Sequence, residues 1–156
     1  MSIEENKAVV RSYIVPPQGF EELNRQIQNA PDPAAFIEKD SREFLGTLFS
    51  PDLVFHSTQG DMSYEDFIQG NIMILTAFKD ISYAVEDMIA EGDKVVVRYS
   101  FRGIHHATMM GVPPTKKEIK GSGIMICKLT GGIIIEAWVI ADIFGMMQQL
   151  GVIPEH

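Results

Sequence analysis

The feature that most constrains the fold is a change of pattern at Lys79-Asp80. After this point the chain holds runs of strand length at 81–90, 94–106, 118–129 and 133–142, separated by segments of glycine, proline and polar residues. Consecutive strands joined by such turns are antiparallel neighbours. We therefore expect a meandering antiparallel sheet in the second half of the chain.

Before this point, apolar residues recur at helical spacing and predict helices at 4–13, 19–30, 34–49 and 64–78. Asp32 precedes Pro33 in the manner of a helix N-cap, and Ser63 with Asp66 resembles a capping box. A short strand is expected at 52–58. Helices first and sheet second predict an α+β fold in which the helices cover one face of the sheet.

Composition limits the candidate partners and the compartment. A chain of 156 residues is most simply one domain, and its net charge of -8 without a basic cluster argues against nucleic acid and membrane surfaces. No apolar run approaches the ~20 residues of a membrane span, and the N-terminus lacks a secretory pattern. The single cysteine, Cys127, cannot form an internal disulfide, so we expect a cytoplasmic protein.

Asp142 ends the last predicted strand, in the alternating row that also carries Trp138, the only tryptophan. An ionised carboxylate in apolar surroundings is costly unless it is paired, so such a residue is usually hydrogen-bonded, exposed or used in chemistry. Two interpretations stay open. Asp142 either caps a helix at 143–150 or acts as an acid/base.

His105 lies on the inward row of the run at 94–106, together with Tyr99 and Phe101. A buried histidine is either a satisfied core residue or, beside a carboxylate and an apolar wall, part of an acid–base site. Arg98 and Arg102 fall on the other row, which argues against an epoxide-hydrolase type of site with an inward arginine.

Metal and covalent chemistry find no support in the sequence. His105-His106 are adjacent in a strand and face apart, and His56 with His105 would need a third ligand. No nucleophile elbow, phosphate-binding loop or dinucleotide fingerprint is present. We expect neither a metal nor a cofactor.

The order of motifs in the second half resembles the SnoaL-like polyketide cyclase family of the nuclear transport factor 2-like superfamily. The motifs are EGDKVVVR at 91–98, FRGIH at 101–105, MGVPPT at 110–115, IEAW at 135–138 and DIFGMMQQLG at 142–151. The resemblance runs from about 45 to 151. It implies a single domain over 1–156 and a cone-shaped α+β barrel, in which a curved antiparallel sheet surrounds a pocket closed by N-terminal helices. The segment at about 16–31 departs from the family pattern and is expected to be a helical insertion.

The resemblance also implies a chemistry. Founding members of the family close a ring by intramolecular aldol condensation, without metal or cofactor, and use an aspartate as acid/base. Asp142 matches that aspartate, His105 matches the histidine of the Gly-x-His motif, and His56 matches a frequently polar position. Thr108 departs from the pattern, because many relatives have an acidic residue there. The expected substrate-binding residues are His56, Tyr13, Tyr64, Tyr99, Phe101, Trp138 and Met110.

Two functions of different classes remain open. In an acid–base enzyme, Asp142 would remove a proton next to a carbonyl, and His105 or a tyrosine such as Tyr13 or Tyr64 would stabilise the enolate, leading to aldol cyclisation or isomerisation. The alternative is a non-enzymatic module for small-molecule binding or dimerisation. In either case the expected ligand is largely apolar rather than phosphorylated.

The sequence also predicts a homodimer. The strands at 118–129 and 133–142 are apolar on both faces. With the Trp138 row assigned to the cavity, Ile133, Ile135, Ala137 and Val139 would face outward and need cover, which a second subunit would supply.

Overall fold

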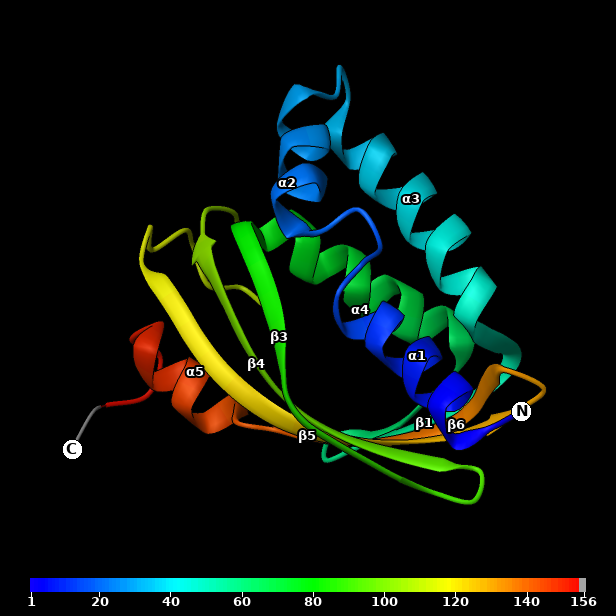
Figure 1. The fold of residues 1–156 in the computed structure, drawn as a ribbon. Helices are drawn as coiled ribbons and strands as arrows, with labels where there is room; N and C mark the ends of the chain where they lie inside the picture. Colours follow the sequence, from blue (N-terminus) through cyan, green and yellow to red (C-terminus); the bar gives the residue numbers. More distant parts are fainter. Residues whose placement is uncertain (155–156) are drawn as a thin grey trace.

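The computed structural model describes residues 1–154 (Figure 1). The helices are α1 (Ile3–Ile14), α2 (Phe20–Asn29), α3 (Pro33–Leu48), α4 (Tyr64–Ala77) and α5 (Ile143–Gln149). The strands are β1 (Phe49–Ser57), β2 (Gly60–Met62), β3 (Phe78–Glu91), β4 (Lys94–His105), β5 (Glu118–Thr130) and β6 (Ile133–Ala141). Among the described residues, no helix has the length and apolar character needed to cross a bilayer.

The helix boundaries follow from local capping, as the sequence predicted. The side chain of Asp32 accepts a hydrogen bond from the Ala35 N–H, and proline occupies the first turn of α3. Ser63 and Asp66 form both hydrogen bonds of a capping box at the start of α4. These bonds satisfy N–H groups that have no partner inside a helix.

The sheet has the strand order β2-β1-β6-β5-β4-β3. The predicted antiparallel meander is confirmed for β3 to β6. The predicted α+β fold with a curved sheet is confirmed, but the sheet is mixed rather than antiparallel throughout, because β1 runs parallel to β6, and it does not close between β2 and β3. The direction of β1 could not be read from a tight turn, since one helix and four strands separate it in sequence from β6.

Helices α1 to α4 cover the concave face of the sheet, and α5 lies at the end of the sheet that is farther from α1 (Figure 1). The side chains between these layers form two core clusters. The first core cluster includes Val10, Leu45, Phe49, Val95 and Cys127. The second core cluster consists of Ala77, Phe78, Ile81, Met109, Ile119, Met146 and Leu150. Tyr83 and Phe101 pack against both clusters.

The face assignment predicted for β6 is wrong. Ala137 is fully buried and Val139 lines a cavity on the concave side, whereas Ile140 is 69% exposed on the convex side. Alternation does not continue through the strand, because the register shifts opposite Lys128 and Leu129 and places Ile134 inside as well. The shift does not explain the faces of Ala137 and Trp138, because residues 136–141 pair with β5 without a break. The inward row was extended to Asp142, but β6 ends at Ala141 and Asp142 is the N-cap of α5.

Two side-chain amides tie helices to the sheet where a neighbouring strand is missing. Asn24 of α2 donates to the Ile81 carbonyl at 2.8 Å and accepts from the Ile81 N–H at 3.2 Å. Gln149, at the end of α5, makes the same pair of bonds with the backbone of Lys120, at 2.7 and 2.8 Å. Helix α2, which lies in the segment predicted as an insertion, is thereby fixed against the edge strand β3.

Candidate functional site

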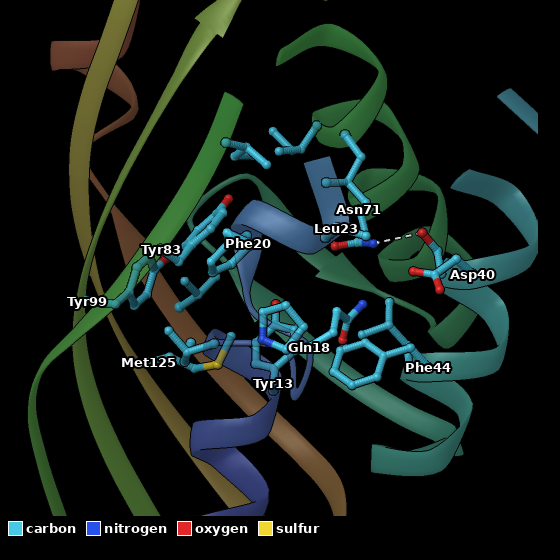
Figure 2. Close-up of a pocket in the computed structure, with 18 of the residues that line it drawn as sticks. Tyr13, Gln18, Phe20, Leu23, Asp40, Phe44, Asn71, Tyr83, Tyr99 and Met125 are labelled. Carbon is cyan, nitrogen blue, oxygen red and sulfur yellow. Dashed lines mark hydrogen bonds between the residues drawn. The ribbon is translucent and has the colours of Figure 1, made fainter. Parts of the chain in front are cut away.

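A cavity with two adjoining lobes lies between the concave face of the sheet and the helices. The larger lobe has a volume of about 150 Å³ and is walled by α1 to α4 and the sheet (Figure 2). The smaller lobe, of about 130 Å³, reaches the end of β6 and the start of α5. Ile74, Ile81, Tyr83 and Tyr99 line both lobes. A ligand that fills both lobes would therefore pass these four side chains.

Three tyrosines supply hydroxyl groups to the larger lobe. Tyr13, Tyr83 and Tyr99 all line it, and the ring centroids of Tyr83 and Tyr99 lie 5.9 Å apart. Burial raises the pKa of each of these phenols above its usual value. The hydroxyls thus stay protonated at neutral pH and are available as hydrogen-bond donors.

The floor of the cavity depends on two glycines of β5. Gly121 is paired with Phe101 and Gly123 with Tyr99 across the β4–β5 ladder. A Cβ on Gly121 would overlap the Phe101 ring, and one on Gly123 would lie 2.5 Å from the Tyr99 hydroxyl oxygen. Because the two glycines carry no side chain, the rings of Phe101 and Tyr99 can lie over β5.

Asp142 is an exposed residue for which the predicted capping role is confirmed, while its acid/base role stays a prediction. It is the N-cap of α5, where its Oδ1 accepts a hydrogen bond from the Gly145 N–H at 2.9 Å. It also lines the smaller lobe, together with Phe101, Ile143 and Met146. The side chain packs so closely over residue 145 that a Cβ there would overlap the carboxylate. Glycine at 145 thus helps to set the position of Asp142.

His105 is fully buried but is not among the residues that line either lobe. The backbone N–H of Thr115 donates to its Nδ1 at 3.1 Å, so the neutral ring carries its proton on Nε2. Within residues 1–154, Nε2 has no hydrogen-bond partner. Phe78 lines the smaller lobe and packs against the imidazole, with ring centroids 5.6 Å apart. The structure thus does not bring His105 and Asp142 into one cavity wall.

The other predicted site residues fall into two groups. Tyr13 and Tyr99 line the larger lobe, and Tyr99 and Phe101 line the smaller one. The remaining four are absent from the linings of both lobes: His56, Trp138, Tyr64 and Met110. The Tyr64 hydroxyl lies over Gly46 of α3, and Met110 is 51% exposed in the connection between β4 and β5.

His56 and Trp138 belong to a cluster on the convex side of the sheet. The Nδ1 of His56 lies 2.8 Å from Asp61, its Nε2 lies 2.8 Å from Glu136, and its ring stacks on Trp138 at 5.2 Å. Hydrogen bonds to Glu136 and Asp61 raise the pKa of His56. The cluster joins β1, β2 and β6 and does not contribute to the cavity wall.

Sequence reasoning missed five polar residues that line the larger lobe: Gln18, Asp40, Ser41, Asn71 and Tyr83. It also placed Arg102 on the outward row, whereas Arg102 is among the residues that line the smaller lobe. A signal for two of the five was present. Asp40 stands four residues after Phe36 and four before Phe44, and Asn71 falls within the apolar stripe of α4. A polar residue inside an apolar helical stripe indicates either a buried hydrogen bond or a cavity.

No group of three or more His, Cys, Asp or Glu side chains within the described chain is placed to hold a metal ion.

Comparison with known proteins agrees with this architecture. The model of the SnoaL-like polyketide cyclase family matches residues 33–150. AclR from Streptomyces galilaeus is 22% identical with a TM-score of 0.75, covering 99% of this chain and 86% of that chain. A SnoaL-like protein from Jannaschia sp. CCS1 is 19% identical with a TM-score of 0.75, covering 99% and 97%.

IdmH from Streptomyces antibioticus, described as a candidate polyketide cyclase, is 27% identical with a TM-score of 0.63. The match covers 76% of this chain and 92% of that chain. A search of curated proteins finds no match. Because the family model covers most of the chain and the fold agrees, this protein belongs to the SnoaL-like polyketide cyclase family.

Proposed function

We propose that the protein is a cofactor-independent acid–base enzyme that acts on an apolar small molecule with a carbonyl group. The observation that carries the proposal is the Asp142 carboxylate in the wall of an apolar lobe, beside Phe101. Tyr99 lines both the smaller and the larger lobe, and its neutral hydroxyl group can donate a hydrogen bond. The description of IdmH as a candidate polyketide cyclase supports a cyclase-like reaction.

The proposed reaction starts with proton abstraction. Oδ1 of Asp142 is engaged with Gly145, so Oδ2 takes the proton from the carbon next to the carbonyl. A tyrosine hydroxyl hydrogen bonds to the enolate oxygen. In an isomerisation the protonated carboxyl returns its proton to another carbon. In an aldol cyclisation the enolate carbon forms a bond to a second carbonyl carbon, and the resulting alkoxide takes the proton from Asp142. General acid–base catalysis of this kind typically accelerates a reaction by ~10²–10⁴-fold.

His105 stays a predicted participant in this scheme. Its Nε2–H is a donor without a partner in the described chain, suited to an enolate oxygen. Phe78 stands between the imidazole and the smaller lobe, so a direct contact with substrate requires that ring to move.

The size of the lobes narrows the substrate. A cavity of about 150 Å³ holds one benzene-sized ring. Lobes of about 150 and 130 Å³ therefore suit a molecule of one or two rings.

The bicyclic ketone 2-tetralone tests the proposal. The wild-type protein in D₂O should accelerate exchange of the protons next to the carbonyl, followed by NMR. Asp142→Asn should lower the rate by at least ~10²-fold, because an amide cannot accept the proton. Folding should change little, since asparagine caps a helix about as well as aspartate. Asp52→Asn, an exposed site outside the cavity, is the control and should keep the wild-type rate.

A non-enzymatic binding module is the second candidate. The hydrogen bond from Gly145 to Asp142 favours it, because a capping role alone explains an aspartate at this position. Binding of 2-tetralone without accelerated exchange would support this candidate and exclude the acid–base role of Asp142 for this ketone.

The proposed assembly is a homodimer formed through the convex face of the sheet. One cross-strand row there contains Trp138, Ile126, Val96 and Ile89, and the next row begins with Ile140 and Ile124. Ile140, Ile89 and Ile124 are 69%, 68% and 49% exposed. An exposed apolar band of this kind is uncommon on monomers.

A further inference from the structure

The larger lobe contains a group of polar side chains that the proposed reaction does not use. Asp40 and Ser41 come from α3, Asn71 from α4, and Gln18 from the segment between α1 and α2 (Figure 2). They lie on the helical side of a lobe whose sheet side is aromatic and aliphatic. A few convergent polar groups in an apolar cavity typically set the orientation of a ligand.

Asp40 is the charged member of this group. It is half-buried, and burial together with the nearby charge of Glu43 raises the pKa of its carboxyl group. No hydrogen bond to this carboxylate is found within residues 1–154. Arg42, two residues away, is instead engaged by Glu38 and by Glu65 of α4. The carboxylate in the cavity wall is therefore left without a cation or a donor.

Asn71 has capacity left for a ligand. Its Nδ2 donates to the Ser41 Oγ at 3.0 Å, which fixes the orientation of the amide. Figure 2 shows the oxygen of this amide directed away from α3, toward the interior of the lobe. Asp40 and Asn71 both line the larger lobe, and a carboxylate oxygen and an amide oxygen are both hydrogen-bond acceptors.

We propose that Asp40 forms a subsite that accepts a hydrogen bond from a hydroxyl group of the ligand, in the lobe that Asp142 does not line, with the Asn71 amide oxygen as a further acceptor in the same wall. This inference rests on the proposed function, in that the same cavity takes the apolar substrate, and it adds that the substrate is a hydroxylated one. The hydroxyl hydrogen is donated to the Asp40 carboxylate, while the carbonyl group lies toward Asp142.

Other polar groups fit this subsite less well. A carboxylate or phosphate on the ligand would meet Asp40 and Glu43, and no lysine or arginine lines the lobe. An ammonium group would have to lose its hydration in a largely apolar lobe, which costs far more than desolvating a neutral hydroxyl. The hydroxyl satisfies an unpaired acceptor without bringing a second charge.

Calorimetry with 2-naphthol and 2-methoxynaphthalene tests the subsite, because the ether keeps the rings but lacks the donor. The wild-type protein should bind 2-naphthol at least ~10-fold more tightly, the range expected for a hydrogen bond to a charged group. Asp40→Leu should bring the two affinities within ~2-fold by weakening 2-naphthol alone. Asp40→Asn, which keeps the shape, is the second variant if the leucine protein does not fold.

Glu43→Gln is the matched control, because it removes a negative charge from the same helix outside the cavity wall. It should keep the preference for 2-naphthol. Equal binding of both probes by the wild-type protein, or an unchanged preference in both Asp40 variants, overturns the subsite and leaves the proposed function standing. A preference lost in Asp142→Asn but kept in the Asp40 variants would place the hydroxyl in the smaller lobe and also overturn it. Failure of both probes to bind would count against the subsite and the apolar-ligand function together.

Discussion

At the scale of single residues, Asp142 shows how one carboxylate can cap a helix and also line a cavity. One of its oxygens caps α5 through Gly145 while the residue lines the smaller lobe. Its place at the end of the last strand could be predicted from sequence, because the apolar run stops there. The role of Gly145 could not be predicted, since it depends on a contact through space with the Asp142 side chain.

Gly145→Ala tests this positioning. The added Cβ would displace the Asp142 carboxylate and break the cap bond, which costs about 1 kcal/mol. Replacing glycine by alanine inside a helix stabilises the helix by about the same free energy. We expect the unfolding free energy to change little while exchange of 2-tetralone protons slows. A variant with the wild-type exchange rate would show that the position of Asp142 is not critical.

His56 makes stability depend on pH. Its pKa is raised in the folded state by the bonds to Glu136 and Asp61. The stabilisation is therefore complete below the unfolded pKa of ~6.5 and is lost as pH rises through the folded pKa. In urea unfolding between pH 5.5 and 9, the wild-type midpoint should fall relative to that of His56→Gln as pH increases. A constant difference across this range would contradict the assignment.

The residue-scale errors of prediction have physical causes. Trp138 was expected in the cavity because it shares a row with Asp142, but Asp142 lies beyond the end of β6, and the strand places Ala137 inside and the indole beside His56. Cys127, from which a cytoplasmic location was predicted, is buried, and burial raises the pKa of its thiol to about 12. The location itself stays a prediction.

At the scale of elements, local signals predicted most of the structure. Caps and turns lie close to each other in sequence, so the helices and the strands of the meander were placed to within a few residues. Two features depend on distant partners and were missed. Strand β2 is only three residues long, and the parallel contact of β1 with β6 joins segments from the two halves of the chain.

Asn24→Ala tests how α2 is held on the sheet. It removes the two hydrogen bonds to Ile81, which are partly buried. Each such bond contributes about 1 kcal/mol, so the unfolding free energy should fall by about 1–2 kcal/mol in urea titration. Gln28→Ala is the control on the same helix, since its single bond to Asp80 is exposed. A cost for Asn24→Ala no larger than that of the control would show that these bonds do not anchor α2.

At the scale of the whole molecule, the cavity is the feature that sequence could not define. The aromatic residues of β4 were correctly placed on the inward row, because alternation is unbroken there. The volume between them and the helices depends on how far α2 and α3 stand from the sheet. No local pattern encodes that separation, so Tyr83 could not be recognised as a lining residue.

The homodimer has a direct test. Light scattering should give twice the mass of the 17.4 kDa chain. Ile124→Lys, near the centre of the convex apolar band, should shift the equilibrium toward monomer, because the charge would be buried in the interface. Met73→Lys replaces an exposed apolar residue of α4 and should leave the mass unchanged. A wild-type species of 17.4 kDa would rule out the dimer.

The position of the cavity between the first and second core clusters has a consequence for folding cooperativity. Tyr83 and Phe101 pack against both clusters, and both side chains line the cavity. A ligand bound there would contact side chains that join the two clusters. We expect it to raise the unfolding temperature and to make the two clusters unfold together.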